Sequence, residues 1–400
     1  MIVSKLKDIA KVISGYAFKS SDFLSDDGIP AIKIKNIKNG DIDLSECDFV
    51  DRKFLSLNEK YHLKRNDILV SLTGSHLTQP NSVVGRIALY RHSFTSLLNQ
   101  RAGKVIPDTN LVDPLYLYAF LSQDSIKETI AKKARGAANQ ANISPGDVED
   151  TEILLPPLPT QRRIASILSA YDDLIENNLK RIKLLEEIAQ RTYEEWFVKF
   201  RVKGEQLPID EKTGLPVGWS MVQLENLISF QKGKKATEIV SEYKEGYLKL
   251  LLLDGIESGK YPYTNPINQV ITDKDDLLML MDGARSSKVF FADKGVVGST
   301  LSKITIKNEY LSSSLMKLFF DTNYELMQTN NTGAAIPHAN KSFINGMQFP
   351  LPINEVLIKW KEIVEIQYKQ IQSLKSQNQK LKESRDILLP KLMNNTLNVE

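Results

Sequence analysis

The side chains in this sequence that could do chemistry are polar and cationic, and many of them fall in a few short stretches. Residues 73–82 (TGSHLTQPNS) carry hydroxyl and amide groups and end near Arg86, and residues 135–142 (RGAANQAN) have a similar composition. Arg, Lys, Asn and Gln bind guanine and adenine edges in the major groove, whereas Ser, Thr and backbone N–H groups hold phosphates. This composition favours contacts with DNA, although any one such stretch is more often an ordinary surface turn.

The second half of the chain has polar stretches at matching places. Residues 282–288 (DGARSSK) correspond to residues 73–82, and residues 332–341 (TGAAIPHANK) correspond to residues 135–142. A further set lies in a strand predicted over residues 29–37, where alternation with isoleucines puts the cationic and amide side chains on one face. Recurrence at matching positions favours DNA contact. The candidate DNA-contacting residues are Lys33, Lys35, Asn36, Thr73, Ser75, Gln79, Arg86, Arg101, Arg135, Gln140, Asn142, Lys232, Lys234, Arg285, Ser286, Lys288, Asn340 and Lys341.

Motifs of known catalytic centres are absent from the sequence. It contains no Gly-x-x-x-x-Gly-Lys-Ser/Thr phosphate loop, no Gly-x-Gly-x-x-Gly, no Gly-x-Ser-x-Gly and no His-Glu-x-x-His. Asp210, Glu211 and Lys212 have the order of a nuclease motif but lie in a turn-rich segment without a predicted strand. A single cysteine, Cys47, and only four histidines argue against a zinc site. We therefore expect no catalytic residue, metal ion or cofactor in this chain.

The composition is that of a folded protein with more than one domain. The chain has 400 residues, of which 42% are hydrophobic and 25% are charged, and this length predicts two or three domains. No apolar run reaches the roughly 18 to 20 residues of a membrane-spanning helix. Residues 1–5 do not lead into a signal-peptide core. We therefore expect a cytoplasmic protein without a membrane partner.

The charge balance is close to neutral. Lys and Arg total 52 and Asp and Glu total 49, which gives a net charge of +3. A protein that binds nucleic acid alone usually has a stronger positive bias. The balance argues against a solitary nucleic-acid-binding protein and leaves a subunit of a larger assembly open. It also motivates the alternative of a coiled-coil scaffolding protein that does not bind DNA.

The elements that position the polar stretches occur twice along the chain. Gly15 corresponds to Gly233, an offset of 233 − 15 = 218 residues, and residues 67–74 correspond to residues 276–283, an offset of 276 − 67 = 209 residues. Three further matches keep the same order along the chain. They are residues 83–85 with 296–298, residues 136–138 with 333–335, and residues 157–159 with 350–352. Two diverged copies of one module are therefore predicted.

Each copy begins with a globular part of mixed structure. Residues 29–37, 67–72 and 83–90 are short, rich in Val, Ile and Leu, and bounded by Gly, Asn or Asp, which is typical of strands. Residues 111–133 have the apolar spacing of a helix. The globular part is thus predicted to combine α-helices and β-strands. Residues 203–218, which are punctuated by Gly and Pro, are predicted to link the two modules.

A long helix is predicted after each globular part. Apolar residues recur at alternating spacings of three and four for about 40 residues, which is a coiled-coil heptad pattern and predicts a rod of about 60 Å. Thr160 and Asn354 are the predicted N-caps, and Pro390 is predicted to end the second helix. The predicted seam residues are Leu168, Ile175, Asn178, Ile182, Leu185, Val364, Ile371, Leu374, Asn378 and Leu381.

The two long helices are predicted to pair with each other. Each seam contains an asparagine near its middle, Asn178 or Asn378, and a seam Asn fixes register and partner at the expense of stability. The alternative is that each helix covers its own domain. The predicted fold class is α+β, with two mixed α/β domains and two long helices. The predicted domains are residues 1–156, the central helix in 157–203, a linker and second globular domain in 204–349, and the C-terminal helix in 350–400.

Several motifs resemble the specificity subunits of type I restriction-modification systems. Residues 66–74 (NDILVSLTG) resemble the family's recurrent strand and turn, and residues 388–393 (LLPKLM) resemble its C-terminal ending. The most specific resemblance is that of residues 137–144 (AANQANIS), followed by residues 154–165 (LLPPLPTQRRIA), to the entry into the family's central conserved helix. The resemblance covers essentially the whole chain. Residues 352–356 (PINEV) depart from the pattern because they lack the Gln-Arg-Arg of the first copy.

The resemblance implies a non-catalytic DNA-recognition subunit. Each globular domain would be a target-recognition domain that binds one half of a bipartite double-stranded DNA target. The helices would form an antiparallel coiled coil within a pseudo-twofold repeat, set the spacer between the half-sites and dock two modification (methyltransferase) subunits. Restriction (translocase/endonuclease) subunits would join them, and S-adenosylmethionine, ATP and Mg would be bound by these partners. A nuclease or methyltransferase centre within this chain is the least favoured alternative.

Overall fold

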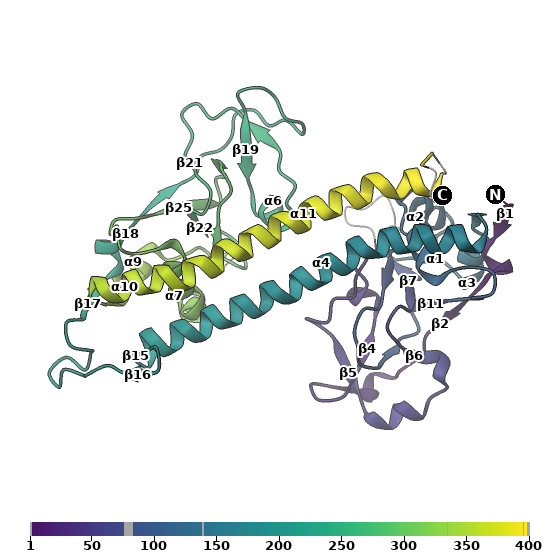
Figure 1. The fold of residues 1–400 in the computed structure, drawn as a ribbon, viewed down its shortest axis with the longest axis horizontal. Coiled ribbons are helices and arrows are strands. Elements are labelled where there is room, and N and C mark those ends of the chain that lie inside the picture. The colour runs from purple at the N-terminus through teal and green to yellow at the C-terminus, as the bar shows by residue number, and fades with distance from the viewer. Residues whose placement is uncertain (1, 76–82, 138–139, 334, 395, 398–400) are drawn as a thin grey trace. The chain divides into compact units, whose positions relative to one another are not determined.

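The computed structural model describes residues 2–75, 83–137, 140–333, 335–394 and 396–397, and it divides into two compact units. Unit 1 comprises Met1–Glu176 and Lys380–Glu400, and unit 2 comprises Asn177–Gln379. Figure 1 labels many of the helices and strands of both units. Among the described residues, no helix is both long enough and apolar enough to span a membrane.

Unit 1 is built on two β-sheets. The first is antiparallel, and the second contains one parallel strand pair, in which residues 31–32 lie opposite residues 97–98. In spatial order, the first sheet consists of β2 (Ala10–Ser14), β11 (Ala102–Pro107), β7 (Ile68–Ser71) and β9 (Ile87–Leu89). The second consists of β3 (Phe23–Leu24), β5 (Asp48–Val50), β4 (Ile29–Ile32), β10 (Ser96–Leu98) and β6 (His62–Leu63). A separate pair joins β1 (Ile2–Lys5) to β14 (Glu152–Leu155).

Two short helices, α1 (Pro114–Leu121) and α2 (Asp124–Ala131), pack on the first sheet of unit 1. The prediction of one helix over residues 111–133 was wrong, because Gln123 has an extended backbone (φ −64°, ψ 136°) and separates the two. The Asp113 carboxylate caps α1 by accepting two backbone N–H groups of its first turn. The backbone N–H of Asp113 in turn donates to the Gln161 side chain at 2.9 Å. Gln161, which is buried, therefore fixes the start of α1 to the start of the long helix α4 (Leu158–Tyr193).

Unit 2 repeats this sheet architecture. Its antiparallel sheet consists of β18 (Ile228–Lys232), β25 (Leu301–Ile306), β22 (Leu277–Leu280) and β23 (Val289–Phe291). Its second sheet consists of β20 (Tyr263–Thr264), β19 (Leu248–Leu251), β24 (Gly295–Val297) and β21 (Ile271–Thr272), with β19 and β24 parallel. β17 (Ser220–Gln223) pairs with β26 (Gln348–Leu351), and α7 (Ser313–Thr322) and α8 (Tyr324–Thr329) correspond to α1 and α2. The predicted internal repeat is confirmed.

One glycine in each unit shows how closely the two copies agree. A Cβ atom at Gly15 would lie 2.4 Å from the carbonyl oxygens of Leu98 and Asn99. A Cβ atom at Gly233 would lie 2.2 Å from the carbonyl oxygen of Gly298. Such contacts are too short for any side chain, so the close approach of the strands requires glycine at both matching positions.

The match of residues 83–85 with residues 296–298 was wrong. Val297 lies opposite Leu251 in the parallel strand pair of unit 2, just as Leu98 lies opposite Ile32 in unit 1. The counterpart of β24 is therefore β10, and the counterpart of β9 is β23. Short Val-rich strings recur in many strands, so sequence alone aligned the wrong pair. In the corrected alignment Arg86 of the first copy is the counterpart of Lys288 of the second. Each of them follows a residue of positive φ, Gly85 or Ser287.

The strand predicted over residues 29–37 was also too long. β4 ends at Ile32, and a short 3₁₀ helix, η3 (Ile34–Asn36), follows. The Asn36 side chain accepts the backbone N–H of Lys33 at 2.9 Å and donates to the carbonyl oxygen of Asp43 at 2.9 Å. Asparagine forms such local backbone bonds in preference to continuing a strand, and the predicted alternation of faces therefore stops at Ile32.

The long helices differ from the sequence-based expectation at their ends. α4 begins before the predicted cap Thr160, at Leu158, and is followed by a π-helical turn, η6 (Glu194–Val198). The second helix consists of α10 (Asn354–Trp360), the π-helical turn η7 (Lys361–Glu365) and α11 (Ile366–Met393). Its N-cap is Ile353, so the predicted cap Asn354 is the first helical residue. Pro390 lies inside the last turn of α11 and does not end it, because its carbonyl oxygen still accepts the backbone N–H of Asn394 at 3.0 Å.

The predicted antiparallel pairing of the helices is confirmed within each unit. In unit 2, Asn178 Nδ2 donates to Asn378 Oδ1 at 2.9 Å, and Lys375 Nζ lies 3.1 Å from Glu186 Oε1. In unit 1, Leu168 shares a hydrophobic core with Leu392. Of the predicted seam residues, Leu168, Ile175, Asn178, Ile182, Val364, Ile371, Leu374 and Asn378 are buried, and Leu185 and Leu381 are half-buried.

Candidate nucleic-acid interface

A three-stranded sheet in unit 1 brings several predicted DNA-contacting residues together. It consists of β12 (Arg135–Ala137), β13 (Gln140–Asn142) and β8 (Thr73–Gly74). Arg135 lies opposite Asn142, and Asn142 lies opposite Thr73. Residues directly opposite each other in a sheet share a face, and so do residues two apart on one strand. One face therefore carries Thr73, Arg135, Gln140 and Asn142.

The chemistry of this face is cationic and amide-rich. Arg135, Gln140 and Asn142 are exposed, whereas Ala141 between them is fully buried. The Arg135 side chain is 83% exposed and lies 3.5 Å from Asp147. A hydrogen bond from the Ser144 hydroxyl, with smaller help from Arg135, holds the pKa of Asp147 below its usual value. Because an exposed ion pair contributes little to stability, Arg135 can exchange Asp147 for a DNA group at small cost.

A second group of predicted residues in unit 1 lines a pocket of about 300 Å³. Lys33, Lys35 and Arg101 surround it together with Asn99, Gln100, Ile34, Phe18 and Phe23. The Lys33 and Lys35 ammonium groups lie 3.1 and 2.9 Å from the same Asp48 oxygen. Partial burial opposes ionisation of Asp48, but hydrogen bonds from these lysines hold its pKa below the usual value. Two cations share one carboxylate, so the pocket keeps an excess of positive charge.

The pocket is connected to the three-stranded sheet through the backbone. The N–H of Leu72, which precedes β8, donates to the carbonyl oxygen of Arg101 at 3.0 Å. In unit 2 the N–H of Met281 donates to the carbonyl oxygen of Thr300 at 2.8 Å in the same way. In unit 1 this backbone hydrogen bond therefore links Arg101, which lines the pocket, to the residue that precedes β8 of the three-stranded sheet.

Unit 2 repeats the cross-strand arrangement of β8, β13 and β12 with different side chains. Asp282 lies opposite His338, and His338 lies opposite Thr332. The Ala339 N–H donates to the Met281 carbonyl oxygen at 2.8 Å, as the Ile143 N–H donates to that of Leu72 at 2.8 Å in unit 1. Asp282, Thr332 and His338 thus occupy the positions of Thr73, Arg135 and Asn142.

The sequence-based candidates omitted Asp282 and His338. The two side chains form a close pair, with His338 Nδ1 2.7 Å from Asp282 Oδ1, and Lys232 Nζ lies 3.6 Å from Asp282 Oδ2. His338 lies 56 residues from Asp282 in the chain, so no local pattern announces the pair. The signal available was the repeat itself, which matches the stretch around His338 with the stretch around Asn142.

The remaining candidates of unit 2 are more dispersed. Arg285 forms two hydrogen bonds with the carboxylate of Glu257, one of them 3.1 Å long between Nη2 and Oε2. Lys234 Nζ donates to the carbonyl oxygen of Asn268 at 2.8 Å. Lys341 Nζ lies 6.0 Å from the Phe230 ring centre, and Lys288 Nζ lies 5.7 Å from that of Phe290. Each of these four cationic side chains contacts a different group.

Three candidate side chains form hydrogen bonds inside their own units. Asn36 and Ser286 are 1% and 0% exposed, and Ser286 Oγ accepts a hydrogen bond from the Asn331 amide at 2.8 Å. Asn340 caps the short helix α9 (Lys341–Gly346) by accepting the Phe343 N–H at 3.1 Å. Burial and internal bonding favour a structural role for Asn36 and Ser286, and we leave both out of the interface proposed below.

Of the other candidates, some lie beside residues 76–82, which are outside the described ranges, and one lies within them. Gln79 lies outside the described residues. Ser75 Oγ accepts the backbone N–H of Val83 at 3.2 Å. The Arg86 N–H donates to Ser71 Oγ at 3.0 Å, and partial burial lowers the pKa of the Arg86 guanidinium, which stays charged at neutral pH.

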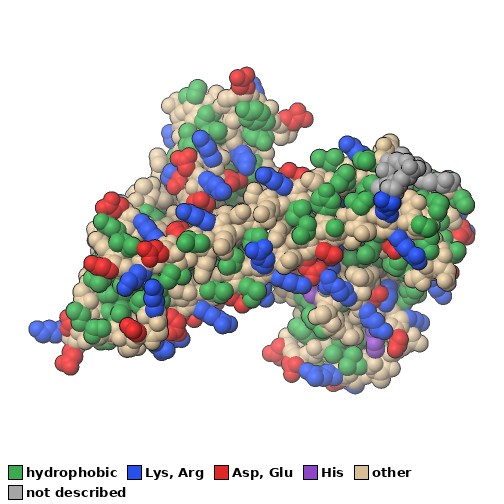
Figure 2. Space-filling model, viewed as in Figure 1, with side chains coloured by type: hydrophobic (Ala, Val, Ile, Leu, Met, Phe, Trp, Pro, Cys, Tyr) green, Lys and Arg blue, Asp and Glu red, His purple; other side chains and the backbone are tan. Residues whose placement is uncertain are grey.

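Figure 2 shows Lys and Arg side chains interspersed with Asp and Glu on the face in view. This mixture agrees with the net charge of +3.

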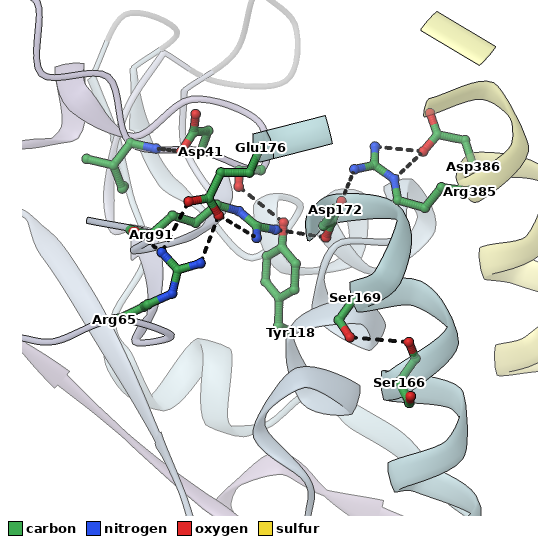
Figure 3. Close-up of polar contacts among 12 residues, drawn as sticks. Asp41, Arg65, Arg91, Tyr118, Ser166, Ser169, Asp172, Glu176, Arg385 and Asp386 are labelled. Atoms are coloured by element: carbon green, nitrogen blue, oxygen red, sulfur yellow. Dashed lines mark hydrogen bonds and ion pairs between the residues drawn. The ribbon is translucent and has the colours of Figure 1, made fainter. Parts of the chain in front are cut away.

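A charged network joins the long helices to the globular part of unit 1 (Figure 3). Asp172 on α4 accepts from Arg385 on α11 at 2.6 Å and from Arg91 at 2.8 Å. Glu176, one turn further along α4, accepts from Arg65 at 2.9 Å. Burial opposes the charge of Arg385, but Asp172 holds the pKa of this guanidinium above its usual value. The two carboxylates therefore fix both helices to the domain that carries the candidate interface.

Metal ligation has no support among the described residues, where no three His, Cys, Asp or Glu side chains are grouped closely enough to hold an ion. The described residues form a duplicated fold, in which each of two related α/β domains is followed by a long helix.

Comparison with known proteins identifies the family. Residues 1–187 and 216–383 match the family described as the type I restriction modification DNA specificity domain. The type I restriction enzyme MjaIX specificity subunit of Methanocaldococcus jannaschii is 24% identical over 426 residues, covering 100% of this chain and 94% of that protein. The putative MjaX specificity subunit of the same organism is 27% identical over 360 residues, covering 88% and 82%. The crystal structure of the type I restriction-modification S subunit from M. genitalium has a TM-score of 0.61 at 17% identity, covering 100% of this chain and 96% of that one. The chain therefore belongs to the family of type I restriction-modification specificity subunits.

Proposed function

We propose that this chain is the non-catalytic DNA-recognition subunit of a type I restriction-modification complex and that each globular domain binds one half of a bipartite target. The observation that carries the proposal is the repeated cross-strand arrangement. It presents Arg135 and Asn142 in unit 1 and Thr332 and His338 in unit 2, all of them exposed. Exposed polar side chains of this kind can hydrogen-bond base edges and phosphates.

The recognition domains proposed are residues 1–156 and the globular part of residues 204–349. The paired helices would set the spacer between the half-sites and dock two modification subunits. In unit 2, α4 exposes Leu179, Leu184 and Ile188, each at least 47% accessible, and exposed apolar side chains on a helix are suited to protein contact. Restriction subunits would complete the complex in the cytoplasm. S-adenosylmethionine, ATP and Mg²⁺ would be bound by the partner subunits, so this chain itself would catalyse nothing.

Footprinting the complex of this chain with its modification subunits tests the proposal. We expect two short protected blocks separated by several unprotected base pairs, because two separate domains would contact the DNA. One continuous block would contradict the bipartite target. Absence of any sequence-dependent protection, together with partners that are neither methyltransferases nor translocases, would favour a coiled-coil scaffold, an alternative that rests on the nearly balanced charge.

A further inference from the structure

We infer that His338, held by Asp282, determines the base preference of the second half-site by accepting a hydrogen bond from an exocyclic amino group, adenine N6 or cytosine N4. The inference rests on the proposed function and adds to it a residue and a base chemistry. His338 is exposed at the surface, and its side chain is 50% accessible to solvent. Core packing therefore does not explain why the ring is held in place.

Backbone and side-chain contacts hold His338 in place. Its backbone N–H donates to the carbonyl oxygen of Thr332 at 2.7 Å, and its Nδ1 lies 2.7 Å from Asp282 Oδ1. A Cβ atom at Gly333 would lie 2.9 Å from His338 Cδ2, so the glycine leaves the space that the ring occupies. An exposed side chain held in this way has lost its rotational freedom before binding, which favours specific recognition.

The pairing with Asp282 fixes which ring nitrogen is available. A carboxylate only accepts, so Nδ1 carries the proton of the Asp282 hydrogen bond. Nε2 of the neutral ring is then an acceptor that faces away from this bond. The base groups that donate in the major groove are adenine N6 and cytosine N4, whereas guanine presents only acceptors there.

The charge beside His338 favours a base edge over a phosphate. Asp282 is 25% exposed and is only partly offset by Lys232, whose ammonium lies 3.6 Å away. A carboxylate at this position repels phosphate oxygens, and it can accept from an amino group. The equivalent face of unit 1 carries Arg135 and Asn142 in place of Thr332 and His338. The two units would therefore prefer different bases at equivalent positions of their half-sites.

Base preference measured for the complex of full-length chain and modification subunits tests the inference. His338→Ala should lower the discrimination at one base pair of the second half-site by about tenfold, because one base contact is lost. Asp282→Asn should lower it at the same base pair, because the ring is no longer held by a charged acceptor. The first half-site should be unchanged in both variants, and unchanged discrimination at the other base pairs of the second half-site shows that unit 2 is folded. Asn142→Ala is the matched control and should alter only the first half-site.

Two outcomes would overturn the inference. The first is an unchanged preference at every base pair of the second half-site in His338→Ala. The second is a uniform loss of affinity for all sequences, which would make His338 a phosphate contact. Either result, obtained while the wild-type complex still prefers a bipartite target, rejects the role of His338 and leaves the proposed function intact. A wild-type complex without any bipartite preference would instead reject the proposed function.

Discussion

Asp172 connects three parts of unit 1, and replacing it with Asn should release them from one another. Its carboxylate accepts from Arg385 on α11 at 2.6 Å and from Arg91 of the recognition domain at 2.8 Å. The three side chains are poorly exposed, at 11% for Asp172, 16% for Arg91 and 29% for Arg385. Asp172→Asn keeps the size of the side chain and removes its charge.

The expected magnitude follows from these contacts. Breaking a buried ion pair by removing one partner costs about 3–5 kcal/mol, because the other charge is left buried. Two features reduce this value. An Asn oxygen can still accept one hydrogen bond, and Glu176 Oε2 lies 4.0 Å from Arg91 Nη1 and partly compensates it. We therefore expect Asp172→Asn to lower the free energy of unfolding of unit 1 by about 3 kcal/mol.

Hydrogen exchange measured by mass spectrometry along a urea series resolves this loss by unit. Peptides of unit 1 should lose protection at lower urea in Asp172→Asn. Tryptophan fluorescence provides an internal control, because Trp196, Trp219 and Trp360 all lie in unit 2. The neighbouring exposed residue Asp173 supplies the matched variant, Asp173→Asn, which should change stability by less than about 0.5 kcal/mol. If Asp172→Asn is no more destabilising than Asp173→Asn, the reasoning is refuted.

Three further predictions concern the helix seam, the pocket lined by Lys33 and Lys35, and the three-stranded sheet of β12, β13 and β8. Asn378→Leu should destabilise unit 2 by about 1–3 kcal/mol because it removes the 2.9 Å hydrogen bond of the buried Asn178 amide, whose other acceptor, Gln377 Oε1, lies 3.5 Å away. The double Leu variant should recover this stability in urea denaturation. Asp48→Asn should lower the free energy of unfolding of unit 1 by its full amount above about pH 5 and by progressively less below about pH 4. The pKa of Asp48 is lowered in the folded state, so its carboxylate stops stabilising the fold as the pH falls through this folded-state pKa. Unfolding measured from about pH 2 to 7 checks this. Arg135→Ala should weaken binding of DNA by the complex by about tenfold, and competition with DNA altered in either half-site should assign the loss to the first.

The helix pairing could be predicted from sequence because its signal is periodic and long. Alternating spacings of three and four placed Ile175, Ile182 and Ile371 in the seam, and all three are buried. The helix ends depend on single residues, and the ends predicted from sequence were wrong. Asn354 is a good cap by type, yet the backbone already turns at Ile353. Pro390 lies in the last turn of α11, and its carbonyl oxygen still accepts the N–H of Asn394.

The candidate interface was predictable only as a set of loops. The repeat located both polar stretches, but the pairing of Asp282 with His338 arises from contacts across 56 residues. Local backbone bonding also overrode the strand pattern at Asn36, whose amide bonds the backbone on both sides. Side-chain type thus indicated the kind of ligand, whereas three-dimensional pairing decided which side chains can reach it.

Methylation mapping in a host that carries the modification subunits, with and without this chain, tests the central claim most directly. The account predicts that methylation requires this chain and falls in a motif of two short specified blocks separated by an unspecified spacer of constant length. Exchanging residues 204–349 for those of a relative should replace one block and keep the other. A single uninterrupted motif, or methylation that does not depend on this chain, would contradict the account.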